Sequence, residues 1–251
     1  MKICGKIKGI WRLTCDAVLD GLFPQNCVHC EGARQRGGDY LCGLCRKEIV
    51  FIGPPYCNCC GAPAELSYDY PTENFACGLC RSKPFAFDQA RSLGLYDSGL
   101  KKLIHHFKYR PQAGVMREIA PLMRDYFAGL DASWNGFYVS PVPLHFRKMK
   151  ERTFDQSFLI AREAARILNL PLANGLLRRI KDTDSQAKKN KQDRAKNIKG
   201  AFQVDRPDRV AGKNILLVDD VFTTGSTVNE AARVLKRAHA DRVHVFTLAR
   251  V

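Results

Sequence analysis

Apolar residues follow two alternating periods along the last two thirds of the chain. Four segments have the alternating or continuous apolar pattern of β-strands: ARSLGLY (90–96), GFYVSPVPL (136–144), NILLV (214–218) and DRVHVFTLA (241–249). The segments between and after them have apolar residues at helical spacing: SGLKKLIHHFKY (98–109), REIAPLMRDYF (117–127), SFLIAREAARILNL (157–170) and STVNEAARVLKRAHA (226–240). Strands separated by helices predict an α/β fold with a parallel sheet flanked by helices on both faces.

One polar segment interrupts this order, RRIKDTDSQAKKNKQDRAKNIKGAF (178–202). It is strongly basic and only weakly periodic. Loops of this length are uncommon inside compact domains, where they usually serve as lids or remain disordered. We therefore weigh two interpretations, a solvated charged loop and a mobile cover over an anionic ligand.

All eleven cysteines lie before residue 81, and eight of them form four CxxC pairs. The pairs are Cys27/Cys30, Cys42/Cys45, Cys57/Cys60 and Cys77/Cys80. Two intervening residues let both thiolates of a pair reach one tetrahedral ion, and the separations of 11 and 16 residues between pairs match zinc ribbons. We predict two zinc ions, with sequential pairing as the first choice and cross-braced pairing left open by the spacing. A disulfide framework is the alternative, but it requires an oxidising compartment.

The cysteine-rich part is the first predicted domain, residues 1–84, and the α/β part is the second, residues 85–251. A stretch this short buries little core, so metal binding is expected to supply its folding energy. The first 23 residues carry cations throughout instead of the apolar core of a secretory signal. We expect them to pack on the protein body, with a peripheral membrane contact as the alternative, and we expect a cytoplasmic protein.

The segment NILLVDDVFTTGSTVNE (214–230) contains the strongest candidate chemistry. Ligands of open α/β sheets bind at the carboxyl ends of the strands, where residues 219–227 are expected. The hydroxyls and glycine of TTGST, together with the N–H groups that begin the next helix, suit a phosphate. Asp219 and Asp220 would repel a phosphate, so they suit the paired hydroxyls of a ribose or a Mg²⁺ ion.

Two other interpretations of this segment are weaker. A Walker-B strand with a metal-binding aspartate is one rival, but the chain has no GxxxxGK[ST] motif. A helix N-cap with incidental acids is the other, and it leaves the combination of two acids, several hydroxyls and a glycine unexplained.

The same segment resembles the 5-phosphoribosyl-1-diphosphate (PRPP) signature of type I phosphoribosyltransferases. The resemblance implies that Asp219 and Asp220 are the catalytic acids, which hold the ribose hydroxyls of PRPP bound with Mg²⁺. It also implies that the TTGST loop holds the 5′-phosphate. The implied PRPP-binding positions are Asp219, Asp220, Val221, Thr223, Thr224, Gly225, Ser226 and Thr227.

Nearly the whole chain resembles the ComF family of proteins associated with DNA uptake in natural competence. The four CxxC pairs, PVPLHFRKMKERTFDQS (141–157), SQAKKNKQDRAKNIKGAF (185–202) and the PRPP signature carry this resemblance. It implies a zinc-binding region joined to a phosphoribosyltransferase-like domain, with a diphosphate near His145, Arg147 and Lys148. It also makes 178–202 the flexible loop, whose cations are Lys188, Lys189 and Arg194. The family's usual RGFNQ is RTFDQ here.

The charge of the chain fits these expectations, because 40 lysines and arginines against 25 acids give +15 and favour anionic partners. Our first functional hypothesis is a ComF-like protein that handles internalised single-stranded DNA and binds PRPP. The alternative is an active phosphoribosyltransferase acting on a base or amine. A third hypothesis makes the zinc region a docking surface for other competence proteins.

Overall fold

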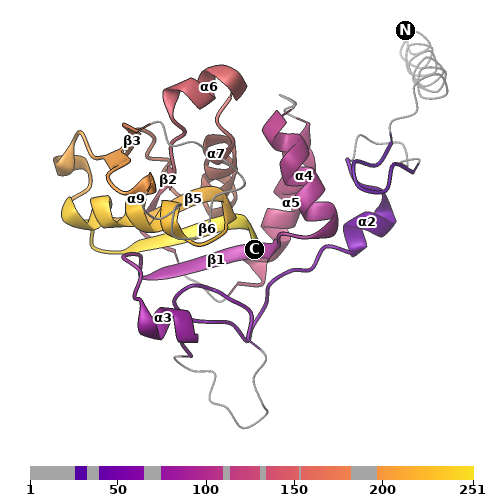
Figure 1. Cartoon of the computed structure of the whole chain (residues 1–251), viewed down its shortest axis with the longest axis horizontal. Helices are drawn as coiled ribbons and strands as arrows, with labels where there is room; N and C mark the ends of the chain where they lie inside the picture. The colour runs from indigo at the N-terminus through magenta and orange to yellow at the C-terminus, as the bar shows by residue number, and fades with distance from the viewer. Residues whose placement is uncertain are drawn as a thin grey trace, which may run out of the picture.

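A computed structural model of the chain describes residues 26–32, 40–64, 75–109, 114–130, 134–152, 154–181 and 197–251. Its centre is a four-stranded parallel sheet with the strand order β1-β6-β5-β2 (Figure 1). The strands are β1 (Gln89–Leu95), β2 (Phe137–Pro141), β5 (Asn214–Phe222) and β6 (Val243–Arg250). The predicted parallel α/β sheet is therefore confirmed.

The helices cover both faces of this sheet, as the apolar run of β5 predicts. Leu216 and Val218 pack with the first helical layer, and Ile215 and Leu217 pack with helix α9 on the other face. The first layer consists of α4 (Ser98–Tyr109), α5 (Val115–Ala128) and α7 (Gln156–Leu168). The second face is covered by α9 (Ser226–Arg237). Successive side chains of one central strand thus enter two separate cores.

Strand β5 is longer than the sequence pattern predicts. The apolar run ends at Val218, but the strand continues to Phe222 and keeps pairing with β6, with Asp219 opposite Thr247. The two aspartates therefore stand on a strand and not in the loop that follows it. Their backbone is fixed by the sheet, which gives the carboxylates a defined position.

The cysteine-rich part packs directly against the α/β body. Cys27 and Cys45 belong to the same hydrophobic cluster as α4 and α5, and Cys57 and Cys60 belong to the cluster that includes α9. The second CxxC pair of each set lies at the start of a short helix, α2 (Gly43–Lys47) or α3 (Gly78–Ser82), with its first cysteine as the N-cap. The domain boundary expected between residues 84 and 85 stays a prediction. Side chains from both sides of it pack in the same two hydrophobic clusters.

The segment between the two cysteine groups runs along the edge of the sheet. Phe51 bridges Gly94 of β1 in antiparallel orientation, and the N–H of Leu95 donates to the carbonyl of Val50 over 2.9 Å. A side chain at position 94 would meet that carbonyl oxygen at 2.7 Å, so glycine allows the close approach. This edge strand, β1, is thereby partly covered.

The two ends of the basic segment 178–202 pair with each other. Strand β3 (Arg178–Arg179) pairs antiparallel with β4 (Phe202–Gln203), so the segment leaves and re-enters the fold at one point. Lys188, Lys189 and Arg194 lie outside the described residues, and their predicted role stays a prediction. Two short helices complete the fold, α6 (Phe146–Arg152) and the 3₁₀ helix η1 (Pro207–Arg209). Among the described residues, no helix is both long and apolar enough to cross a membrane.

Candidate functional site

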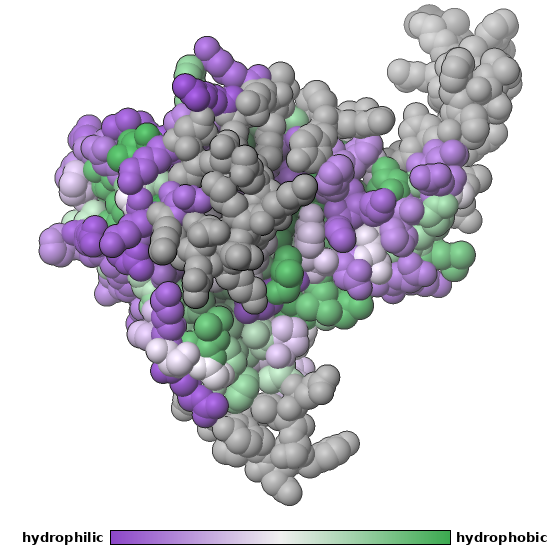
Figure 2. All heavy atoms as spheres, in the orientation of Figure 1, coloured by the Kyte–Doolittle hydropathy of each residue, from purple (hydrophilic) through white to green (hydrophobic). Residues whose placement is uncertain are grey.

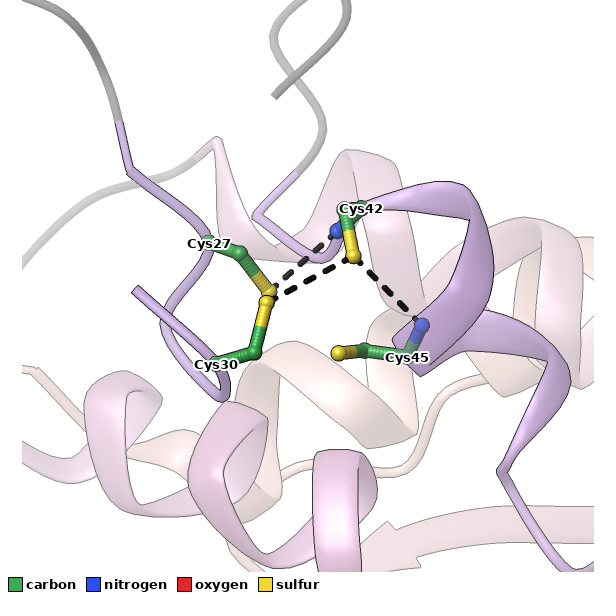
Figure 3. A group of neighbouring side chains, drawn as sticks. All are labelled: Cys27, Cys30, Cys42 and Cys45. Atoms are coloured by element: carbon green, nitrogen blue, oxygen red, sulfur yellow. Dashed lines mark hydrogen bonds between the residues drawn. The ribbon is translucent and has the colours of Figure 1, made fainter. Parts of the chain in front are cut away.

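The eight cysteines of the CxxC pairs form two separate tetrads. Within each tetrad the sulfur atoms lie within 4.8 Å of one another. Figure 3 shows the sulfurs of the first set turned toward a common centre. The tetrads are Cys27, Cys30, Cys42 and Cys45, and Cys57, Cys60, Cys77 and Cys80. Sequential pairing is thus confirmed, and cross-bracing is not formed.

The sulfur spacing fits zinc. Tetrahedral zinc with bonds of about 2.3 Å requires sulfurs about 3.8 Å apart. The sulfurs of Cys30 and Cys42 lie 3.7 Å apart, and those of Cys60 and Cys77 also lie 3.7 Å apart. No disulfide joins the cysteines that the structure describes. The cysteine sets and the spacing of their sulfurs therefore indicate two zinc ions.

Backbone N–H groups favour the thiolate in the first tetrad. The N–H of Cys42 donates to the sulfur of Cys27 over 3.3 Å, and that of His29 donates over 3.5 Å. Although burial opposes ionisation, donors from Cys30, Cys42 and His29 lower the pKa of Cys27 to about 6. The thiolate is the form that binds metal, so the turn prepares this ligand.

The second tetrad is held by two buried arginines of the sheet. Arg250 of β6 donates to the carbonyl of Cys60 over 2.6 Å, and its other nitrogen lies 3.5 Å from the Cys60 sulfur. Arg91 of β1 donates to the carbonyl of Asn58 over 3.1 Å. Four thiolates leave a zinc site with a net negative charge, which these guanidinium groups oppose. Cys59, which belongs to none of the four CxxC pairs, stays outside the tetrad.

The two aspartates on β5 have different partners. Asp219 accepts through Oδ1 from the hydroxyl of Ser157 at 2.8 Å and from the N–H of Asp220 at 2.9 Å. Burial, together with the charge of Asp220, raises the pKa of Asp219 to about 7. Asp220 forms an ion pair with Lys108, with 2.6 Å between Oδ2 and Nζ. Burial alone would lower the pKa of Lys108, but Asp220 raises it, so the lysine stays charged.

The loop after β5 has the shape expected of an anion site. Gly225 precedes α9 with a φ of 73°, which only glycine adopts without strain. The hydroxyls of Thr224 and Ser226 lie 2.8 Å apart and share a hydrogen bond. The N–H groups of the first turn of α9 follow directly, and such N–H groups suit a phosphate.

The segment PVPLHFRK leaves the sheet beside the aspartates. Pro141 pairs with Val218, and the N–H of Val142 donates to the carbonyl of Val218 over 2.9 Å. Its next residues therefore lie at the edge where Asp219 stands. His145 accepts at Nδ1 from the N–H of Arg147 over 3.4 Å. The side chain of Lys148 lies outside the described residues, so the diphosphate contacts predicted for this segment stay predictions.

The sequence did not predict three residues that position the two aspartates. Ser157 binds Asp219, Lys108 binds Asp220, and Gln156 donates to the backbone carbonyl of Lys108 over 3.3 Å. Gln156 and Ser157 lie at the start of α7, in the segment RTFDQS that the family resemblance already singled out. Lys108 has no such signal, because it is one cation among several in its helix.

Comparison with known proteins agrees with both parts of this geometry. The double zinc ribbon domain matches residues 18–82, and the phosphoribosyl transferase domain matches residues 155–251. Competence protein F of Haemophilus influenzae is 34% identical over 235 residues, which cover 91% of this chain and 98% of that protein. The chain belongs to the ComF family.

Two further members of the ComF family are similar over nearly their whole length. DNA utilization protein YhgH of Escherichia coli is 29% identical, covering 90% of this chain and 97% of that protein. Competence protein ComFC of Bacillus subtilis is 27% identical, covering 96% of this chain and 97% of that protein. The similarity to both relatives therefore spans the cysteine-rich part and the α/β part of this chain.

The departure from the ComF sequence RGFNQ has a structural counterpart at Asp155. Its Oδ1 caps α7 by accepting from the N–H of Phe158 at 3.0 Å, and its Oδ2 accepts from the N–H of Leu144 at 3.5 Å. Burial raises the pKa of Asp155, against the effect of these donors. An asparagine has only one carbonyl oxygen, so the aspartate alone accepts through two oxygens. Thr153 lies outside the described residues.

Proposed function

We propose that this protein handles internalised single-stranded DNA in the cytoplasm during natural competence, and that its phosphoribosyltransferase-type domain binds PRPP with Mg²⁺. The observation that carries the proposal is the likeness to competence protein F over 91% of the chain. The relatives named for DNA utilization support it, as does the net charge of +15. Cationic proteins gain affinity for nucleic acid by releasing its counterions.

The geometry of the aspartates supports PRPP as the small ligand. In the described part of the chain, Oδ1 of Asp219 and Oδ2 of Asp220 are engaged, and one oxygen of each carboxylate remains as an acceptor. Two such oxygens suit the two neighbouring hydroxyls of a ribose. A phosphate bound at residues 223–227 would lie beyond the end of the same strand, as in a ribose 5-phosphate.

Magnesium suits this edge of the sheet because carboxylate and phosphate oxygens are its preferred ligands. Asp219 and Asp220 supply the carboxylates, and the diphosphate of PRPP supplies the remaining charge. When bound, the ion would offset the charge of the diphosphate. Lys108 already offsets the negative charge of Asp220. The repulsion that the anionic PRPP would meet at this carboxylate is therefore reduced even without Mg²⁺.

A titration of labelled single-stranded DNA tests the proposal, with and without PRPP·Mg²⁺ and across salt concentrations. We expect DNA affinity that falls as salt rises, and a change in that affinity when PRPP·Mg²⁺ is present. Absent or salt-insensitive DNA binding would contradict the DNA-handling function. Unchanged DNA affinity together with measurable PRPP binding would show that the protein binds the two ligands independently.

An active phosphoribosyltransferase is the second candidate function, favoured by the paired aspartates at the carboxyl edge. In such a reaction the protein positions PRPP and excludes water while diphosphate leaves the ribose. Calorimetry with PRPP·Mg²⁺ tests it, using the double variant Asp219→Ala, Asp220→Ala. Heat of binding in the natural protein and none in the variant is expected. Absence of PRPP binding in the natural protein would exclude this candidate.

The zinc region also supports docking of other competence proteins. Leu44 and Leu79 stand at equivalent places in the two CGLC turns and are 75% and 53% exposed. Each leucine replaced by serine should weaken such docking while the zinc content stays at two ions per chain. Deleting residues 1–84 is a poor test, because it would uncover the core shared with α4 and β1.

A peripheral membrane contact through residues 1–23 is tested by vesicle sedimentation. These residues lie outside the described residues.

A further inference from the structure

Helix α6 presents an apolar face that the described fold leaves exposed. Phe146 is 60% exposed and Met149 is 46% exposed. Residues three apart lie on the same face of a helix, so the two side chains are neighbours. Large apolar side chains grouped on the surface mark contact sites more often than single exposed ones do.

The same short helix is strongly cationic. Its sequence FRKMKER contains four cations and a single carboxylate. Lys150 holds its ammonium 4.5 Å from the centre of the Phe146 ring, within the range of a cation–π contact. Figure 2 shows hydrophobic and hydrophilic surface side by side where α6 projects at the top of the view. An exposed ring flanked by cations suits a ligand with flat apolar faces and negative charges.

The position of α6 connects it to the paired aspartates. The helix begins directly after the segment that leaves β2, at the carboxyl edge of the sheet. The side chain of Asp155, just after α6, accepts from the N–H of Leu144, just before it, at 3.5 Å. Two residues later Ser157 binds Asp219. The base of α6 and the carboxylate on β5 therefore share one continuous set of contacts.

We propose that α6 is a contact surface for single-stranded DNA, in which Phe146 stacks on a nucleobase while Lys150 contacts a neighbouring phosphate. This inference rests on the proposed DNA-handling function and names the surface that performs it. Single-strand-binding proteins combine exposed aromatic rings with cations in this way. One helix of seven residues with two apolar side chains is too small for a stable protein interface, which needs about 800 Å² per partner.

Fluorescence anisotropy with the full chain tests the proposal, using a labelled oligothymidine of about 16 nucleotides, an upper site size for one single-strand-binding fold. Phe146→Ala should weaken binding roughly 5- to 150-fold, the range that one base stack contributes. Phe146→Trp should retain binding, and DNA should quench the new indole. Phe51→Ala is the matched control, because Phe51 is also exposed but lies by the far edge strand β1.

An abasic oligonucleotide separates stacking from charge. It should bind the natural protein as weakly as oligothymidine binds the Phe146→Ala variant, and that variant should not distinguish the two oligonucleotides. Lys150→Ala should reduce the slope of log affinity against log salt by about 0.7, the value for one single-strand phosphate contact. Lys101→Ala, whose ammonium lies 6.0 Å from the Tyr96 ring, should leave the slope unchanged.

The outcomes distinguish this inference from the function on which it rests. If the natural protein binds DNA and Phe146→Ala binds equally well, α6 is not the DNA surface, and the DNA-handling function stands. The same holds if Phe51→Ala weakens binding as much as Phe146→Ala does. If the natural protein binds no single-stranded DNA at any salt concentration, both proposals fail. Unchanged thermal unfolding of Phe146→Ala shows that the exposed ring is not needed for folding.

Discussion

Ser157 and Asp219 join helix α7 to strand β5 through a hydrogen bond of 2.8 Å. The serine donates to Oδ1, the same oxygen that accepts from the N–H of Asp220 at 2.9 Å. Both donors fix one oxygen of the carboxylate, which also fixes the place of the other. The ligand-facing geometry of β5 therefore depends on a side chain from the family segment RTFDQS.

Replacing Ser157 by alanine should weaken PRPP·Mg²⁺ binding about tenfold or more. The change leaves a partly buried carboxylate with one donor instead of two, and a hydrogen bond to a charged group contributes about 1.5–3 kcal/mol. Isothermal titration calorimetry measures the affinity, and thermal unfolding shows that the fold persists.

Ser140→Ala is the matched control for that measurement. Ser140 is a buried serine on the neighbouring strand β2, and its hydroxyl has no hydrogen-bond partner among the described residues. Its removal should leave PRPP binding within about twofold and should not lower the melting temperature. Equal effects of the two substitutions would show that the Ser157 hydroxyl does not position Asp219.

The protonation of Asp219 predicts a pH dependence of PRPP binding. Burial and Asp220 raise the pKa of Asp219 to about 7 from an ordinary value of 3.8. Because Oδ1 already accepts two hydrogen bonds, a proton on this carboxyl group would sit on Oδ2, and Oδ2 is purely an acceptor for a ribose hydroxyl only when the group is ionised. Affinity for PRPP·Mg²⁺ should therefore rise between pH 6 and pH 8. Calorimetry across that range measures it, with the pH dependence of PRPP's own ionisation subtracted.

The raised pKa of Asp219 affects the stability of the fold in the opposite direction to PRPP affinity as the pH rises. Between about pH 4 and pH 7 the folded state holds a proton on Asp219 that the unfolded state has released, so this residue's contribution to stability falls as pH rises. Asp219→Asn removes the titrating group, and should reduce both pH dependences. A variant with the natural protein's pH profile would assign the titration to another group.

The tetrads could be predicted from sequence, whereas the contacts that hold the aspartates could not. CxxC spacing is local, so it identifies the eight ligands, and the structure then shows that neighbouring pairs share an ion. Ser157 and Asp219 are 62 residues apart, and Lys108 and Asp220 are 112 apart in the sequence. Such pairs form only when helices dock on the sheet, and no local pattern records that docking.

The extent of β5 shows a second limit. The hydrophobic pattern places the end of the strand at Val218, since the next two residues are acidic. Pairing with β6 nevertheless continues through Phe222, because backbone hydrogen bonds along a central strand do not depend on the side chains. Sequence therefore predicts the type of element here better than its end.

Substitutions in the two zinc sites should have unequal effects on stability. Cys57 is fully buried and its tetrad is bonded to the sheet through Arg250 and Arg91. Cys30 is exposed. Both Cys57→Ser and Cys30→Ser should reduce zinc from two ions to one per chain, but Cys57→Ser should lower the melting temperature more. Elemental analysis and calorimetric unfolding measure these two quantities.

Chelation provides an independent check on the zinc sites. Slow removal of both ions should unfold the cysteine-rich segment, because metal binding contributes much of the folding free energy of such sites. Loss of near-ultraviolet circular dichroism on chelation, with recovery on adding zinc, is the expected result. Full retention of the melting temperature without zinc would show that packing alone holds these segments.

The anion loop after β5 depends on a glycine for two separate reasons. Gly225 has a φ of 73°, which is strained for any residue with a Cβ atom. A Cβ there would also lie 2.6 Å from Cζ of Phe222 and 3.1 Å from Cε1 of Phe85. These rings pack with one another under the loop, so they can yield only by shifting the loop or the ring of Phe222.

Gly225→Ala should therefore weaken PRPP·Mg²⁺ binding and destabilise the protein by more than the roughly 1–3 kcal/mol of backbone strain. Gly175→Ala is the matched control, because Gly175 has a φ of 78° with nothing within 4 Å of the added Cβ. The control carries the strain without the clash and lies outside residues 223–227, so its PRPP affinity should be unchanged. Denaturant unfolding gives the difference between the variants, which isolates the steric contact with Phe222. Equal destabilisation of the two variants, with PRPP affinity retained in both, would show that the loop accommodates the added methyl group. The contact between Gly225 and Phe222 would then not determine the geometry of the phosphate site.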